Sequence, residues 1–322
     1  MEQATCTVCP RGCKLAEGAW GFCEVRAAQG GSVQDMYYSA LAAPGIQCRW
    51  ANEDLSWSFP GMQNIPTAEV FLPGCNLKCD FCAAPYLAWI SDIRGIRWVD
   101  PLDLVRALFG SVDVVGFSGG EPSIHVEYVT DVFSLCRDRG IRTCLQTNGF
   151  MSDSTARKLS EVTDFVSVGL KASLDREFYK RKLGVDTEPI LDAIKLFLGS
   201  GRDVILTNLT DPNFWDDRRA FEDLIVWIVR NLGSEIPLVL APLETVDISP
   251  PWTDERVYVT PRDQRQTYLE QYRRIATEAG LRRVFFQINV RGRSEQRRAE
   301  LEKMGLQRTL QRLGMRPSRQ EW

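Results

Sequence analysis

Seven of the ten cysteines lie in two short clusters, and these clusters constrain the fold more than any other sequence feature. The chain begins without the basic and apolar regions of a secretory signal, and no apolar run approaches the roughly 18 residues that span a bilayer. We therefore expect a cytoplasmic protein, in which clustered thiols bind metal more often than they form disulfides. The clustered residues are Cys6, Cys9, Cys13, Cys23, Cys75, Cys79 and Cys82.

From about residue 68, short apolar runs alternate with amphipathic stretches. Helix start signals support this pattern, because Asp100-Pro101 gives an N-cap followed by a proline and Ser152 is a second N-cap. Such an alternation predicts an α/β fold, with a parallel sheet and right-handed crossovers. About six units fit a partial (β/α)6 TIM-like barrel. The predicted strands are 69–72, 112–118, 142–147, 165–170, 203–208, 238–241 and 284–288.

Composition divides the chain into three parts. Residues 1–65 are rich in glycine and cysteine and irregular, which predicts an arm held together by metal. Residues 66–290 form the predicted barrel. Residues 291–322 carry nine Lys or Arg against four Asp or Glu, so we expect a basic helical tail that packs on the barrel. The alternative for this tail is docking on an acidic protein or a nucleic acid.

Charge and histidine content argue against several function classes. The net charge of −3 does not call for a polyanionic partner, so nucleic acid is not an expected ligand. With a single histidine, His125, the chain lacks a histidine pair for catalysis and the several histidines of many zinc sites. We expect His125 at the surface of a helix, and Cys136 and Cys144 as small buried hydrophobic residues.

The second cysteine cluster follows the first predicted barrel strand, at the strand end where barrel enzymes build active sites. Soft thiolates suit an iron–sulfur cluster or zinc. A closed site needs four ligands, so three cysteines would leave one iron of a four-iron cubane open for a substrate or cofactor. The alternative is a zinc knuckle completed by a distant cysteine, such as Cys48 in the loop between the two clusters.

The motif Cys75-x3-Cys79-x-Phe81-Cys82, followed one βα unit later by Ser118-Gly119-Gly120-Glu121-Pro122, resembles the radical S-adenosylmethionine (SAM) superfamily. The resemblance implies a partial (β/α)6 barrel in which the three cysteines hold a 4Fe–4S cluster and the open iron chelates SAM. It also implies that Phe81 and the Gly-Gly-Glu-Pro segment belong to the cofactor site. Glycines permit close backbone approach, and the Glu121 carboxylate can pair with the SAM ammonium.

Two later strand ends narrow this resemblance to the pyruvate formate-lyase activating enzymes and their relatives. They are Gln146-Thr147-Asn148-Gly149 and Val168-Gly169-Leu170-Lys171. The resemblance implies that Thr147, Asn148 and Lys171 belong to the SAM site, with Lys171 near the SAM carboxylate and Gly169 in place of an aspartate. The alternatives are a plain turn at Thr147 and Asn148, and a solvated lysine at a strand end.

The amino-terminal cluster offers four thiolates in one short segment, which is a closed ligand set for a structural metal. Spacing alone does not choose among zinc, a single iron and a second Fe–S cluster. The arm, with its Cys9-Pro10-Arg11-Gly12-Cys13 segment, resembles the start of the AmmeMemoRadiSam-system radical SAM proteins. The resemblance covers about residues 5–290, but those relatives carry a histidine where this chain has Leu238-Val239.

These motifs together predict an enzyme that reductively cleaves SAM to a 5′-deoxyadenosyl radical, which takes a hydrogen atom from a substrate. Three substrate classes stay open, namely a protein glycyl residue, a peptide and a small metabolite. A reductant such as flavodoxin or ferredoxin would supply the electron, and no membrane partner is expected. The alternative function is a non-catalytic zinc or Fe–S module that contacts protein or nucleic acid.

Overall fold

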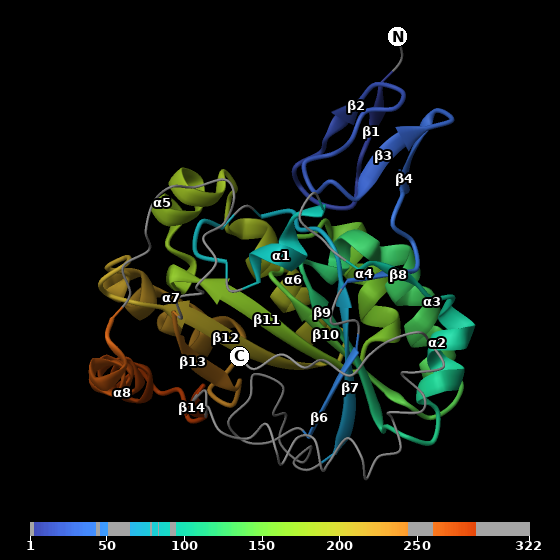
Figure 1. Cartoon of the computed structure of the whole chain (residues 1–322). Coiled ribbons are helices and arrows are strands. Elements are labelled where there is room, and N and C mark those ends of the chain that lie inside the picture. Colours follow the sequence, from blue (N-terminus) through green and yellow to red (C-terminus); the bar gives the residue numbers. More distant parts are fainter. Residues whose placement is uncertain are drawn as a thin grey trace.

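An eight-stranded sheet forms the centre of the molecule (Figure 1). This computed structural model describes residues 3–42, 46–50, 65–77, 79–82, 84–90, 95–243 and 260–287, with the backbone alone for 46–50. Seven strands run parallel, and β6 (Ile46–Trp50) joins one edge antiparallel to β7 (Pro66–Leu72). Beyond β7 the sheet continues in the order β9 (Val114–Gly119), β10 (Arg142–Thr147), β11 (Phe165–Lys171), β12 (Asp203–Thr210), β13 (Leu238–Pro242) and β14 (Val284–Phe286).

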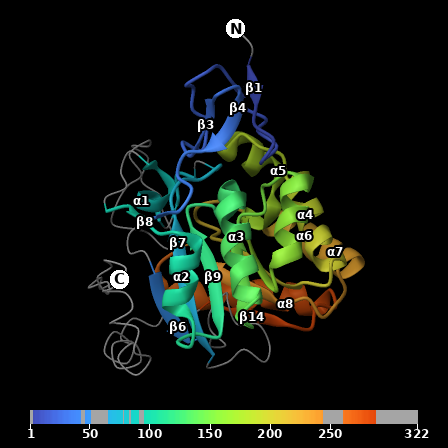
Figure 2. The same cartoon turned by 90° about the vertical axis from the view of Figure 1, so that its right-hand side faces the viewer.

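Helices connect the parallel strands and pack side by side along the curved sheet (Figure 2). Strand residues such as Val115 and Phe117 of β9 and Val166 of β11 are fully buried, as expected for parallel strands that are covered on both faces. The architecture confirms the predicted partial barrel. The longer helices are α2 (Pro101–Leu108), α3 (Val126–Arg137), α4 (Asp153–Val162), α6 (Glu188–Gly199), α7 (Arg218–Asn231) and α8 (Arg262–Glu278).

Short helical segments follow several strand ends. The 3₁₀ turn η2 (Pro122–His125) leads into α3, and α1 (Pro85–Ala88) follows the central cysteine loop. After β11 the chain forms the turn η3 (Ala172–Leu174), the single turn α5 (Arg176–Phe178) and the π-helical segment η4 (Tyr179–Leu183). These segments surround the end of the sheet at which the parallel strands finish.

The amino-terminal arm lies over the same end of the sheet (Figure 1). It contains two small antiparallel pairs, β1 (Ala4–Thr5) with β2 (Lys14–Leu15) and β3 (Arg26–Gln29) with β4 (Ser32–Asp35). The next strand, β5 (Ala40–Leu41), pairs with β8 (Arg97–Trp98), which precedes α2. The arm therefore carries its four cysteines to the mouth of the barrel.

Most predicted elements are confirmed, and three expectations need correction. Cys136 and Cys144 are buried as predicted, and strand 142–147 matches β10 at both ends. The last strand ends earlier than predicted, at Phe286, and Ile288 lies outside the described residues. Cys48 lies within β6 and not in a loop, because that segment extends the sheet. His125 is buried and not at a helix surface, as shown below. The tail 291–322 lies outside the described residues.

Candidate active site

The central cysteine loop leaves β7 and is held by the Gly119-Gly120 turn at the end of β9. The amide of Gly120 donates to the Leu72 carbonyl at 2.9 Å, and the amide of Glu121 donates to the Gly74 carbonyl at 2.8 Å. A Cβ on Gly120 would lie 1.8 Å from the Gly74 oxygen, so glycine alone permits this backbone approach. The Gly-Gly segment thus fixes the start of the cysteine loop, whatever its role toward a cofactor.

The three thiols of this loop are enclosed by protein. Cys75 and Cys79 are buried, and Cys82 is half-buried. Burial raises the pKa of all three thiols, that of Cys79 to about 12, and the nearby Cys79 and Cys82 raise the pKa of Cys75 further. Soft sulfurs gathered away from water need a positive counter-charge to deprotonate, so this donor set fits an iron–sulfur cluster.

Glu121 ties the turn after β9 to the end of β10. Its buried carboxylate accepts hydrogen bonds from the Thr147 hydroxyl at 2.6 Å, from the Asn148 amide at 2.7 Å and from the Ser123 amide at 3.0 Å. Desolvation raises the pKa of Glu121, and these donors act in the opposite direction. The carboxylate therefore organises the predicted SAM-site residues Thr147 and Asn148, in addition to any contact with SAM.

Asn148 reaches the cysteine loop itself. Its Nδ2 lies 2.9 Å from Oδ1 of Asn76 and 3.8 Å from Sγ of Cys75, to which it donates a weak hydrogen bond. Asn76 in turn donates to the Phe150 carbonyl at 2.6 Å. The buried side-chain amides of Asn76 and Asn148 therefore join the end of β10 to the thiol loop. A plain turn, the alternative considered for Thr147 and Asn148, would not need these contacts.

Lys171 is the last residue of β11, the strand after β10 in the sheet. Its positive charge opposes the rise in the pKa of Cys79 and of Cys82. A Cβ at Gly169 would lie 3.2 Å from the Lys171 Nζ, so the amine occupies space that a side chain at Gly169 would restrict. Phe81 packs against Phe178 and Phe214, with ring centroids 5.5 and 5.1 Å away, and walls the loop from the η3–η4 side.

Comparisons with known proteins agree with this site. Residues 70–225 match the model of the Radical SAM superfamily. The chain is 32% identical over 192 residues to the pyruvate formate-lyase 1-activating enzyme of Escherichia coli K12, an alignment that covers 57% of this chain and 74% of that enzyme. This chain belongs to the radical SAM superfamily. An uncharacterized protein of Methanocaldococcus jannaschii is 27% identical over 286 residues, which are 88% of this chain and 81% of that protein.

A solved structure agrees at the level of the fold. SuiB of Streptococcus suis bound to S-adenosylmethionine has a TM-score of 0.51 at 20% identity, and the match covers 69% of this chain and 51% of that chain. Superfamily membership makes the chain a radical SAM enzyme, with a 4Fe–4S cluster and SAM as the cofactors of hydrogen abstraction. It favours the enzyme over a non-catalytic metal-binding module. No helix within the described ranges is long and apolar enough to cross a membrane.

The radical SAM enzyme carries a second group of thiols in its arm. All four amino-terminal cysteines line one cavity, together with Arg11 and Asn76. A Cβ at Gly21 would lie 3.8 and 3.9 Å from Sγ of Cys13 and Cys23, so these two sulfurs approach the same point. Throughout the described ranges, no three Cys, His, Asp or Glu side chains stand as close as the ligands of a single ion.

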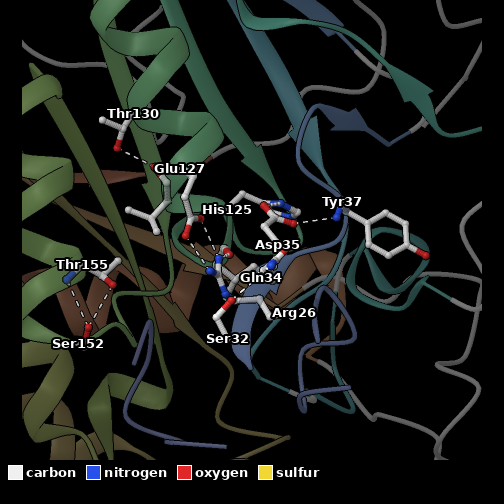
Figure 3. Close-up of polar contacts among 12 residues, drawn as sticks. Arg26, Ser32, Gln34, Asp35, Tyr37, His125, Glu127, Thr130, Ser152 and Thr155 are labelled. Carbon is white, nitrogen blue, oxygen red and sulfur yellow. Dashed lines mark hydrogen bonds and ion pairs between the residues drawn. The ribbon is translucent and has the colours of Figure 1, made fainter. Parts of the chain in front are cut away.

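Two charged pairs fix the arm to the radical SAM barrel (Figure 3). Arg26 of β3 forms two hydrogen bonds with the Glu127 carboxylate at 2.7 and 2.8 Å, and it donates to the Ile124 carbonyl at 3.0 Å. His125 is fully buried, with Nδ1 2.8 Å from Asp35 Oδ2 and Nε2 2.7 Å from the Pro73 carbonyl. A carbonyl only accepts, so Nε2 carries a hydrogen, and the Asp35 carboxylate favours a second one on Nδ1.

The position of His125 was predicted wrongly, because its partners Asp35 and Pro73 are distant along the chain. The available signal was its place three residues after Pro122, directly behind the Gly-Gly-Glu-Pro turn. Arg26 was also missed as a functional residue, although it closes the Gly-Phe-Cys-x-Val-Arg segment of the arm. Their partners, Asp35 and Glu127, are distant in sequence, so only the fold shows the pairs.

Proposed function

We propose that Cys75, Cys79 and Cys82 hold a 4Fe–4S cluster with one open iron, and that the neighbouring strand ends bind SAM. The carrying observation is that three enclosed thiols follow β7 in a loop that Glu121, after β9, and Asn148, after β10, hold through hydrogen bonds. When bound, the cluster supplies one electron that splits SAM into methionine and a 5′-deoxyadenosyl radical, which abstracts a hydrogen atom. The residues of this chain orient SAM and exclude water.

Two charged side chains are suited to the ends of the methionine part of SAM. The Lys171 ammonium would pair with the carboxylate in a charge-assisted hydrogen bond. The Glu121 carboxylate, which accepts hydrogen bonds from Ser123, Thr147 and Asn148, would pair with the SAM ammonium. Gly119, Gly120 and Pro122 shape this turn, and Phe81 packs beside the thiol loop against Phe178 and Phe214.

Thr147 and Asn148 would act on the cluster side of the site. The Thr147 hydroxyl holds Glu121 in place, and the Asn148 amide lies at the Cys75 sulfur. Hydrogen bonds to ligand sulfurs shift the reduction potential of Fe–S clusters. These hydrogen bonds support the proposed place of Thr147 and Asn148 in the cofactor site, which the sequence motif suggested only by resemblance.

A direct test uses the anaerobically reconstituted protein with SAM and dithionite. We expect 5′-deoxyadenosine to form, and Cys79→Ala to abolish it with the loss of the central iron. Cys136→Ala is a matched control, because Cys136 is also buried but lies in α3. Iron and cleavage that persist in Cys79→Ala would overturn the proposed ligand set.

We infer that the substrate is a glycyl residue of a partner protein. The support comes from relatives named as activating enzymes for pyruvate formate-lyase, (2S)-3-sulfopropanediol dehydratase and 4-hydroxyphenylacetate decarboxylase. A flavodoxin or ferredoxin would deliver the electron. Incubation with a candidate partner labelled with dideuterated glycine should place deuterium in 5′-deoxyadenosine. Transfer from a small metabolite, with none from the protein, would overturn this substrate and leave SAM cleavage standing.

We also propose that Cys6, Cys9, Cys13 and Cys23 bind a structural metal centre, which is zinc, a single iron or a second Fe–S cluster. The support is that all four line one cavity of an arm that has few buried apolar residues of its own. Metal analysis of Cys79→Ala should find this metal retained. A chain with no metal beyond the central iron would contradict the second site.

A further inference from the structure

Arg11 extends from the arm site to the central cysteine loop. It lies in the tight turn between Cys9 and Cys13, where the Gly12 amide donates to the Cys9 carbonyl at 3.2 Å. Its Nε donates to the carbonyl of Asn76, the residue after Cys75, at 2.7 Å. Its Nη2 donates to the Leu183 carbonyl at 3.0 Å, at the end of η4. One side chain thus joins the arm turn, the thiol loop and the segment after β11.

The charge of Arg11 has no carboxylate partner in the part of the chain that the structure describes. Its two hydrogen-bond acceptors are neutral carbonyls, and its guanidinium carbon lies 3.6 Å from the ring centroid of Phe22. Arg26 differs, because Glu127 binds it with both carboxylate oxygens. The guanidinium of Arg11 is therefore held by neutral acceptors and an aromatic ring.

Arg11 lies between the two groups of thiols. It lines the arm cavity together with Cys6, Cys9, Cys13 and Cys23. Its Nε binds the backbone of Asn76, the residue that follows Cys75 in the central loop. The guanidinium therefore connects the arm thiols with the start of the central thiol loop.

We propose that Arg11 is a positioning residue that raises the electron affinity of the central cluster. It does so through a fixed positive charge beside Asn76. This inference rests on the proposed cluster at Cys75, Cys79 and Cys82. Reduction adds one negative charge to the cluster, and a nearby cation stabilises that charge, most strongly where water is excluded. Net charge and hydrogen bonding around the ligands are established determinants of Fe–S reduction potentials.

The experiment compares Arg11→Gln, which removes the charge, with Arg11→Lys, which keeps it but loses the two-pronged donor geometry. Arg157→Gln is the matched control, because Arg157 is exposed on α4 and paired with Asp153. Each reconstituted protein is titrated with a redox dye series, and the reduced cluster is followed by electron paramagnetic resonance. The midpoint potential distinguishes a charge effect from a purely structural one.

We expect Arg11→Gln to lower the ratio of reduced to oxidised cluster about tenfold at fixed potential, which corresponds to about 59 mV for one electron. Arg11→Lys should stay closer to the unsubstituted protein, and Arg157→Gln should not shift. An intact cluster with an unchanged potential in Arg11→Gln would overturn the proposal. So would equal shifts in the Gln and Lys variants, or loss of the cluster in both. If the unsubstituted protein bound no central cluster, the proposed function itself would fail.

Discussion

The two cysteine sites of this molecule differ in ligand number and in the elements that hold them. The arm offers four thiols in a segment with only short strand pairs, whereas the barrel offers three in a loop held by the ends of β7, β9 and β10. A complete ligand set adds metal-binding free energy to folding, and an incomplete one leaves a coordination position for chemistry. Ligand count and the stiffness of the surrounding fold together separate a structural centre from a catalytic one.

The largest expected effect tests whether the arm site is structural. Cys13→Ser removes one of four soft ligands, and structural zinc in finger peptides contributes about 10–16 kcal/mol near pH 7. We expect the arm metal to be lost and residues 3–42 to become sensitive to limited proteolysis. The central iron should decline less than in Cys79→Ala. A protease-resistant arm with unchanged metal content would contradict a structural role for the arm site.

The next prediction concerns the barrel side. In Gly120→Ala the new Cβ would meet the Gly74 carbonyl oxygen at 1.8 Å, and backbone cannot move aside cheaply. We expect a loss of about 3 kcal/mol or more of unfolding free energy, together with loss of central iron. Chemical denaturation and iron analysis measure the two effects.

Gly140→Ala is the matched control for this substitution. Gly140, unlike Gly120, has a positive φ, of 70°, and a Cβ there would meet nothing within 4 Å. The left-handed conformation alone should cost about 1 kcal/mol, with the central iron retained. If the two variants lost similar amounts of stability and of central iron, the close approach of the Gly-Gly turn to Gly74 would not explain how the cysteine loop is held.

The contact between arm and barrel supplies the third prediction. His125→Gln removes a buried cation and leaves Asp35 without its partner, which costs about 3 kcal/mol for a broken buried pair. Burial alone would lower the pKa of His125, and Arg26 acts in the same direction, but Asp35 and the Pro73 carbonyl raise it above 6.5 overall. The stabilisation should therefore be complete below about pH 6.5 and should fade as the pH rises through the raised value.

Unfolding curves at several pH values check the direction of this pH dependence. The difference in stability between the unsubstituted protein and His125→Gln should shrink from pH 6 toward alkaline pH. A difference that grew with pH would show that His125 is buried in its neutral form. Asp35→Asn is the reciprocal variant and should reduce the same pH dependence.

Sequence patterns predicted the barrel well because each strand and helix carries local signals. The N-caps Asp100 and Ser152 accept the expected backbone hydrogen bonds, and parallel strands read as short apolar runs. The thiol loop and the Gly-Gly-Glu-Pro turn were predictable because their spacing is local as well. The buried role of His125 and the reach of Arg11 were not, since their partners are 90 and 65 residues away along the chain. Contacts between residues so far apart depend on the fold and produce no periodic pattern in the sequence.

The smallest expected effect tests SAM binding at the barrel site. Lys171→Met keeps the aliphatic stem but removes the ammonium, so a charge-assisted hydrogen bond of about 1.5–3 kcal/mol to SAM would be lost. That corresponds to about a tenfold to hundredfold weaker binding of SAM, which anaerobic equilibrium dialysis with the oxidised cluster can measure. Lys158→Met, on the exposed face of α4, should bind SAM normally. The arm cavity also contains cations, Arg11 and Arg26, so the role of Lys171 must be tested by SAM binding and not by charge alone. Unchanged SAM affinity in Lys171→Met would contradict the proposed pairing of Lys171 with the SAM carboxylate.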